Sequence, residues 1–152
     1  MSRKQIVDCA RTYIGTPFRH QGRVKGLACD CVGLPYCVGA EIGLKDRSGV
    51  LINKYENLNY AAQPTDLFVH TECQRLLVEK PVGQMQEGDV LTLKMPTIPC
   101  HVAIVSRLYV GTPNECFGII HSFSLAHKVV ETILDGGMRG RIHGCFSFPE
   151  AE

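Results

Sequence analysis

The two halves of the sequence have different hydrophobic patterns, and they meet near residue 88. Before that point apolar residues recur at helical spacing, which predicts helices over 4–14, 30–42 and 65–79. After it, short runs rich in β-branched residues predict five strands, over 90–93, 101–106, 117–123, 129–134 and 142–148. Helices followed by short strands indicate an α+β fold, in which an antiparallel sheet of about five strands packs against the N-terminal helices.

Glycine and capping residues mark the expected ends of the helices. Gly15 and Gly43 are stop signals for the first two helices, and Thr65 is the expected N-cap of the third. Between the helices, residues 18–29 read as a polar loop punctuated by glycine, and residues 45–64 as an irregular segment.

Length and charge bound the class of protein. The 152 residues fit one domain, residues 1–152, and the net charge of +1 gives no reason to expect a nucleic-acid partner. No apolar run approaches the roughly 20 residues that span a bilayer, so we expect no membrane span. The N-terminal residues lead into an amphipathic pattern and not into the apolar core of a signal peptide. We therefore expect synthesis in the cytoplasm and, for work outside it, delivery by another device.

Eight cysteines are many for this length. A disulfide framework and a set of reduced thiols both remain open, although disulfide scaffolds usually occur in shorter secreted chains. A metal site is not expected, because Cys29, Cys31 and Cys37 lack the ligand spacing of a zinc finger or ribbon. Cys100 and His101 are adjacent in the chain and cannot easily share one metal ion.

One cysteine and two histidines stand where nucleophilic chemistry needs them. Cys31 follows a glycine-rich loop and is expected near a helix N-terminus, where unpaired N–H groups and the helix dipole lower a thiol pKa. His101 begins an apolar strand, and His121 lies on the next strand, beside it in an antiparallel pair. His101 would act as general base and His121 would orient its ring. The competing interpretation is a buried cysteine with two satisfied core histidines.

Five sequence blocks in a fixed order resemble the NlpC-type cell-wall peptidase family, and together they cover nearly the whole chain. They are residues 15–22, 30–34, 88–90, 101–105 and 120–122. Within this family, the Arg19-His20-Gln21-Gly22 stretch, Val32 after the cysteine and the closing residues 145–149 are similar to the branch found in phage tails and prophages.

The resemblance implies a papain-like fold with a Cys–His–polar triad: Cys31 as nucleophile, His101 as base and His121 as third member. It implies a peptidoglycan hydrolase without a cofactor, which cuts the bond between D-glutamate and a diamino acid in stem peptides. Because the cysteine precedes the histidine, the chain has the unpermuted order and differs from the circularly permuted lipid acyltransferases.

Four residues are expected at the substrate: Phe18, Arg19, His20 and Asp30. Phe18 stands where many family members have a tyrosine, and it has no hydroxyl to donate. Asp30 would bind a substrate ammonium, or else cap the second helix. The basic loop that includes Arg19 and His20, with Arg23 and Lys25, would bind stem-peptide carboxylates, or else lie solvated.

Three functional interpretations remain at this stage. The first is a peptidase that acts in the periplasm or cell wall as part of a phage tail or related particle, with peptidoglycan stem peptides and other tail proteins as partners. The second is an inactive structural or plug component of a tail tip. The third is a related cysteine amidase, or a toxin, that acts on another acyl substrate.

Overall fold

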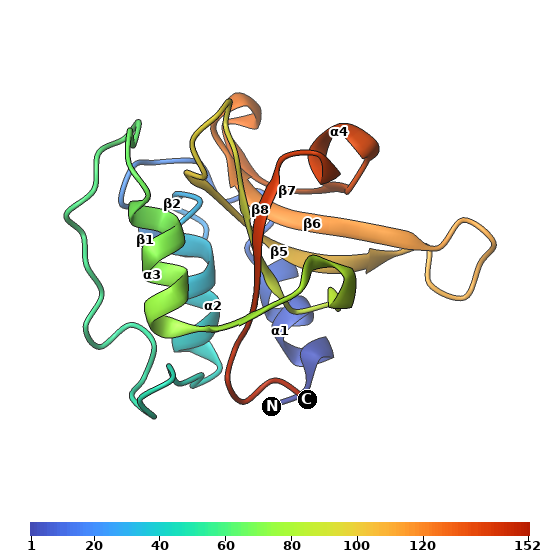
Figure 1. Ribbon diagram of the computed structural model, residues 1–152, viewed down its shortest axis with the longest axis horizontal. Coiled ribbons are helices and arrows are strands. Elements are labelled where there is room, and N and C mark those ends of the chain that lie inside the picture. The colour runs from blue at the N-terminus through green and yellow to red at the C-terminus, as the bar shows by residue number, and fades with distance from the viewer.

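A six-stranded antiparallel sheet forms the centre of the computed structural model, which describes residues 1–152 (Figure 1). Its strand order is β3-β8-β4-β5-β6-β7. The strands are β3 (Val78–Lys80), β4 (Val90–Leu93), β5 (His101–Leu108), β6 (Cys116–Phe123), β7 (Lys128–Ile133) and β8 (Ile142–Ser147). The five predicted strands are present within two residues of their expected ends. The edge strand β3 is additional, so a sheet of about five strands has six.

Three nine-residue helices precede most of the sheet. They are α1 (Arg3–Arg11), α2 (Gly33–Glu41) and α3 (Phe68–Leu76), and a short α4 (Gly136–Arg139) comes later. Single 3₁₀ turns occur at η1 (Val82–Gln84) and η2 (Ser124–Ala126). A second, two-stranded sheet, β1 (Arg23–Val24) and β2 (Ala28–Cys29), forms inside the loop predicted over 18–29.

All three predicted helices are longer than the observed ones. The predicted 65–79 helix was too long at both ends: Thr65 is not its N-cap, because α3 begins at Phe68, whose N–H donates to the Asp66 carboxylate at 3.1 Å. At the other end Leu77 is already extended, with φ −115° and ψ 170°, so the chain leaves the helix and enters β3. Apolar spacing alone does not register this change, because the short edge strand continues the pattern.

The two faces of the sheet carry hydrophobic cores of unequal size. The larger core, 24 buried residues, lies between the sheet and helices α1, α2 and α3. The smaller core, 8 buried residues, lies on the other face and includes Met85, which follows η1, and Leu134, which precedes α4. Alternation along β5 explains the division, since Val102 and Ile104 belong to the larger core and Ala103 and Val105 to the smaller.

The Gly88-Asp89 pair closes the end of the sheet near the termini. Asp89 is fully buried and binds Arg3 of α1 at 2.6 Å, Lys80 of β3 at 2.9 Å and the Ser147 hydroxyl of β8 at 2.5 Å. Gly88 has φ +80°, and an added Cβ would lie 3.2 Å from the Arg3 carbonyl oxygen. A left-handed backbone and a close approach therefore both favour glycine here. The two chain ends lie side by side in Figure 1.

All eight cysteines are free thiols. No cluster of three or more His, Cys, Asp or Glu side chains that could hold a metal ion occurs in the chain. None of the helices has both the length and the apolar character needed to cross a membrane.

Candidate active site

A cleft of about 660 Å³ opens at one end of the main sheet. Residues from segments 60–65 and 95–100 line it, and these segments lie at the top of Figure 1, in green and yellow. Residues of the 18–32 segment, the start of β5 and the turn after β6 complete its walls. Cys31 and His101 both line this cleft, so the structure brings together two residues that are 70 positions apart in the sequence.

Cys31 lies in the turn that leads into α2. The helix begins at Gly33, two residues later, and Val32 is its N-cap residue. Ser122 of β6 donates to the Cys29 carbonyl at 2.6 Å, which ties this turn to the sheet. Residue Cys31 is half-buried, and its sulfur lies 3.7 Å from the carbonyl oxygen of Cys100, the residue before His101.

The environment of the Cys31 thiol disfavours an isolated negative charge. Burial raises the pKa of Cys31 to about 12, and the charge of Asp30 adds to the rise. The backbone N–H groups of Val102 and Val32 act in the opposite direction and lower this pKa, but they do not prevail. The sequence-based expectation of a lowered thiol pKa is therefore wrong for the unliganded protein, because burial outweighs the helix start.

The two predicted histidines form a hydrogen-bonded pair across β5 and β6. His101 Nε2 lies 2.7 Å from His121 Nδ1, and His121 Nε2 lies 3.2 Å from the Thr132 hydroxyl on β7. Both rings are buried, with exposed fractions of 7% for His101 and 1% for His121. The antiparallel neighbour relation inferred from the sequence is confirmed.

One arrangement of protons along these polar groups leaves His101 able to accept a proton. If His121 Nε2–H donates to Thr132, then His121 Nδ1 accepts from His101 Nε2–H. His101 Nδ1 then carries a lone pair, and no protein hydrogen bond occupies it. Burial lowers the pKa of His101 to about 3, with a further lowering from His121, and burial lowers that of His121 to about 4. Both rings are therefore neutral near pH 7.

Asp30 is buried in the cleft wall with both carboxylate oxygens fully occupied. One oxygen accepts from Arg23 Nη1 at 2.8 Å and from the Gly33 N–H at 2.7 Å. The other accepts from the Gln21 N–H at 2.7 Å and from the Tyr60 hydroxyl at 2.5 Å. The bond to Gly33 means that Asp30 does hold the start of α2. An ammonium group could reach Asp30 only by displacing one of these four donors.

The remaining residues expected at the substrate divide into two groups. Phe18 and His20 line the cleft, whereas Arg19 is exposed and does not line it. Arg23 and Lys25 of the basic loop are ion-paired, Arg23 with Asp30 and Glu56, and Lys25 with Glu41 at 2.7 Å. These two cations are therefore already engaged, and the prediction that the whole loop binds carboxylates is wrong for them.

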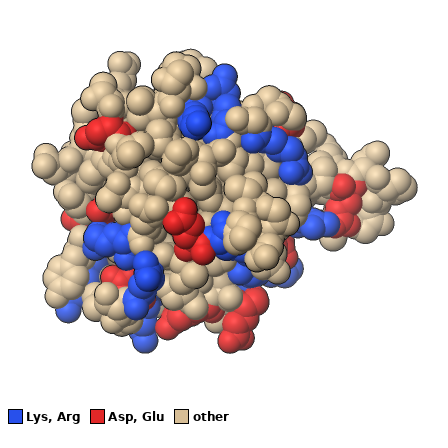
Figure 2. Space-filling model, in the orientation of Figure 1, with Lys and Arg blue, Asp and Glu red and all other residues tan.

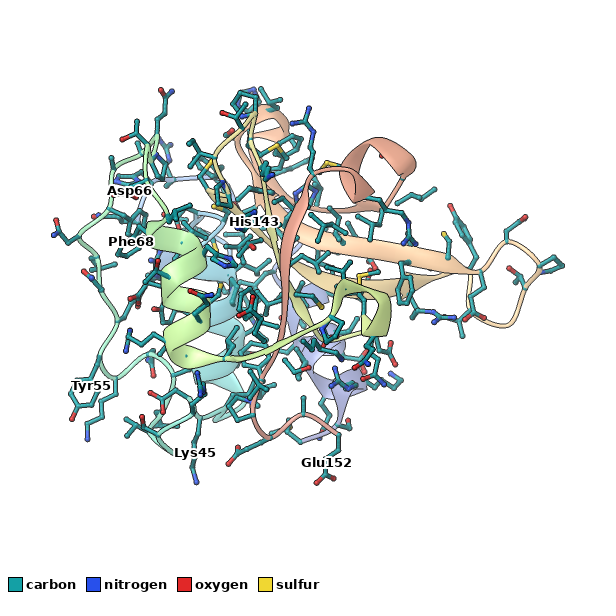
Figure 3. The ribbon with its side chains drawn as sticks, in the orientation of Figure 1. Lys45, Tyr55, Asp66, Phe68, His143 and Glu152 are labelled. Atoms are coloured by element: carbon teal, nitrogen blue, oxygen red, sulfur yellow. The ribbon has the colours of Figure 1, made fainter.

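Among the cleft residues that sequence reasoning missed are Tyr60, Cys100 and Arg141. Tyr60 comes from the irregular segment 45–64 and stacks on Phe68, with ring centroids 5.4 Å apart. Phe68, labelled in Figure 3, lies at the start of α3. The Tyr60 hydroxyl also accepts from Arg23 Nη2 at 2.8 Å. No motif surrounds these residues, so only the fold reveals that they share a cleft.

Comparison with known proteins gives a structural likeness. No family model matches the chain, and no curated protein matches it. An NLP/P60 family protein from Staphylococcus aureus, described as similar to a lipoprotein, has a TM-score of 0.59 at 18% identity. An NlpC/P60 family protein from Bacillus cereus has a TM-score of 0.62 at 18% identity. The NlpC/p60 domain of the peptidoglycan hydrolase SagA has a TM-score of 0.58 at 21% identity.

The share of each chain that aligns differs among these structures. The alignments cover 96%, 96% and 97% of the present chain, in the order given above. The chain spans only 41% of the Staphylococcus aureus protein and 40% of the Bacillus cereus protein, but 99% of the SagA domain. At these identities the likeness shows a shared fold. It confirms the predicted α+β fold with an antiparallel sheet, and a cysteine at a helix start beside that sheet is consistent with the papain-like kind.

Proposed function

We propose that this chain is a cysteine peptidase that hydrolyses peptide bonds of bacterial peptidoglycan. The observation that carries the proposal is the meeting of Cys31 with the hydrogen-bonded His101–His121 pair at one cleft. The fold, shared with an NlpC/p60 domain of a peptidoglycan hydrolase, supports the substrate class. A shared fold alone does not determine function, so the argument depends on the site.

In this proposal Cys31 is the nucleophile and His101 the general base. Burial opposes a lone thiolate and a lone imidazolium, so the proton moves from Cys31 to His101 Nδ1 as the sulfur attacks the carbonyl carbon. Both charges then arise together and stabilise each other. His121 holds the His101 ring through the 2.7 Å bond.

The same proton then serves the leaving group. His101 donates it to the departing amine as the tetrahedral intermediate collapses to a thioester on Cys31. The backbone N–H groups near the sulfur, those of Val32 and Val102, are the candidate donors to the oxyanion. A water molecule, deprotonated by His101, attacks the thioester, and the free acid and the Cys31 thiol are released.

The finer proposal is a D-glutamyl–diamino acid bond, cut in the periplasm or cell wall by a protein of a phage tail or related particle. The resemblance of residues 19–22, Val32 and residues 145–149 to the phage-tail and prophage branch supports that setting, and other tail proteins would be partners. Phe18 departs from the tyrosine of many family members, whereas Asp30 is retained and accepts from Gln21 and Arg23.

The test is turnover of defined muropeptides, read by mass spectrometry. Wild-type protein should release two fragments, and Cys31→Ala should release none. Cys116→Ala is the matched control, because Cys116 lies at the far end of β6 and outside the cleft. Equal turnover by wild type and Cys31→Ala would contradict the proposal.

A second candidate is a structural component that keeps the fold without the chemistry. The raised thiol pKa and the missing hydroxyl at Phe18 favour it. Absence of turnover by wild-type protein on every muropeptide, with the protein folded, would support this alternative. Turnover of a different acyl substrate would instead indicate the amidase or toxin of the third interpretation.

A further inference from the structure

One acidic and one basic side chain line the cleft, Asp30 and Arg141, and their charges are not balanced in the same way. The Asp30 carboxylate is neutralised by Arg23 and saturated by hydrogen bonds. Arg141 forms no ion pair: its only protein partners are backbone carbonyl oxygens. The cleft thus contains a compensated anion and an uncompensated cation.

Arg141 is held in place from the segment that leads to His101. It lies just before β8, and its carbonyl oxygen accepts from the Lys94 N–H at 2.8 Å. Its Nη1 donates to the carbonyl oxygens of Lys94 at 3.2 Å and Pro96 at 3.5 Å. The guanidinium group is therefore anchored by one nitrogen, while Nε and Nη2 have no protein partner.

A guanidinium held in this way suits a planar anion. Two N–H groups of arginine match the two oxygens of a carboxylate, and hydrogen bonds between charged partners are roughly twice as strong as neutral ones. The surroundings have the same sign, since Lys and Arg atoms gather along the top of the face shown in Figure 2, near the start of β8 and α4. No carboxylate of the protein competes for Arg141.

We propose that Arg141 is the carboxylate-binding subsite of the cleft, and that it selects stem peptides by a free carboxylate. This choice of ligand rests on the proposed function, since stem peptides carry free carboxylates. The cleft therefore binds an anionic group on the Arg141 side. The Asp30 side is closed to an ammonium by Arg23 and Tyr60.

The test measures binding separately from turnover. Calorimetry on the Cys31→Ala protein uses two synthetic stem peptides, one with free carboxylates and one with carboxamides in their place. We expect the carboxylate peptide to bind on the order of tenfold to a hundredfold more tightly. Arg141→Gln in the same background should reduce this ratio to about one. Arg139→Gln, which removes an equal charge two residues away and outside the cleft, should leave it unchanged.

Each outcome bears on one proposal at a time. Equal affinity for the two peptides, no binding of either, or a preference that survives Arg141→Gln would overturn the subsite. A preference that Arg141→Gln removes, together with no cleavage by wild-type protein, would keep the subsite and remove the peptidase. Cleavage of both peptides at equal rates would support the peptidase and count against the subsite. Thermal unfolding of Arg141→Gln confirms that lost preference is not lost folding.

Discussion

Two buried carboxylates, Asp30 and Asp89, each bind cations and hydrogen-bond donors, and they lie at different places in the molecule. Asp89 is fully buried and neutralised by two cations, Arg3 and Lys80. Asp30 is 3% exposed and has one close cation, Arg23, with a tyrosine hydroxyl and two backbone N–H groups. Each carboxylate is satisfied, so burial is tolerated in both cases.

The difference lies in what their partners do. The partners of Asp89 come from α1, β3 and β8, and they join the N-terminal helix to the edge of the sheet. The partners of Asp30 come from the 18–29 loop, the start of α2 and the 45–64 segment, which form one wall of the cleft. The Asp89 network therefore stabilises the fold, whereas the Asp30 network also shapes the cleft.

Removal of the Asp89 carboxylate should have the largest effect. Asp89→Ala leaves the partly buried cations Arg3 and Lys80 without a counter-ion, and we expect a loss of about 3 kcal/mol in the free energy of unfolding. Urea unfolding measures it. Asp8→Ala is the control with the same charge change, because Asp8 is 49% exposed and its pair with Lys4 is worth at most about 1 kcal/mol. Similar losses in both variants would refute the structural role of Asp89.

Asp30→Asn should separate the two networks. The amide cannot accept all four donors, and Arg23 loses one of its two carboxylate partners, so we expect a loss of about 2–3 kcal/mol in unfolding free energy. Arg23 keeps its ion pair with Glu56 in this variant. Unlike Asp89→Ala, Asp30→Asn should also lose muropeptide turnover at temperatures where it remains folded. Full turnover per folded molecule would show that the Asp30 network does not shape the site.

Acid should destabilise the cleft end through its histidines. The pKa of His101 is lowered to about 3 and that of His121 to about 4, from an ordinary value of 6.5. Between about pH 4 and pH 6.5 the unfolded chain binds more protons than the folded chain. The contribution of these histidines to the free energy of unfolding is therefore fully present above about pH 6.5 and falls as the pH drops toward 4. Each histidine contributes about 1.4 kcal/mol per pH unit.

His121→Gln tests this assignment. Urea unfolding at pH 7, 6 and 5 should show a dependence on pH that is smaller than in wild type by about 1 kcal/mol per unit, averaged over this range. His70, whose pKa burial also lowers, contributes in the same direction in both proteins. His127→Asn is the control: the residue is exposed, and asparagine tolerates its left-handed backbone, φ +61°. An unchanged pH dependence in His121→Gln would contradict the buried pair.

Tyr60→Phe should have the smallest effect. It removes the hydroxyl that donates to Asp30 and accepts from Arg23, and we expect a loss of about 1 kcal/mol in unfolding free energy. Tyr55→Phe is the matched control, because Tyr55 is 64% exposed. If the two variants unfold alike, the hydroxyl of Tyr60 has no part in the Asp30 network.

Much of the fold could be predicted because its elements carry regular patterns. The β-branched runs of β4 to β8 indicated the strands, and apolar spacing indicated all three long helices. The edge strand β3 could not be found, because three residues after a helix show neither period clearly. The β1–β2 hairpin has only two residues in each strand. It is defined by the pairing of Arg23 with Cys29 and not by a sequence pattern.

The site was predictable where chemistry and local position coincide. Cys31 at a helix start and two histidines on adjacent strands follow from sequence, and the structure brings Cys31 and His101 to one cleft with His121 bonded to His101. The saturation of Asp30 and the free face of Arg141 could not be predicted. They depend on loops whose placement is set by tertiary contacts between distant residues, such as Tyr60 with Asp30.

Capture of the acyl-enzyme is the most direct test of the central claim. Rapidly quenched wild-type protein, mixed with a muropeptide and digested, should show the acyl fragment attached to the Cys31 peptide as a thioester. His101→Ala should show little, and Cys31→Ala none. Fragments released without any adduct on Cys31, at a rate that Cys31→Ala matches, would contradict the account.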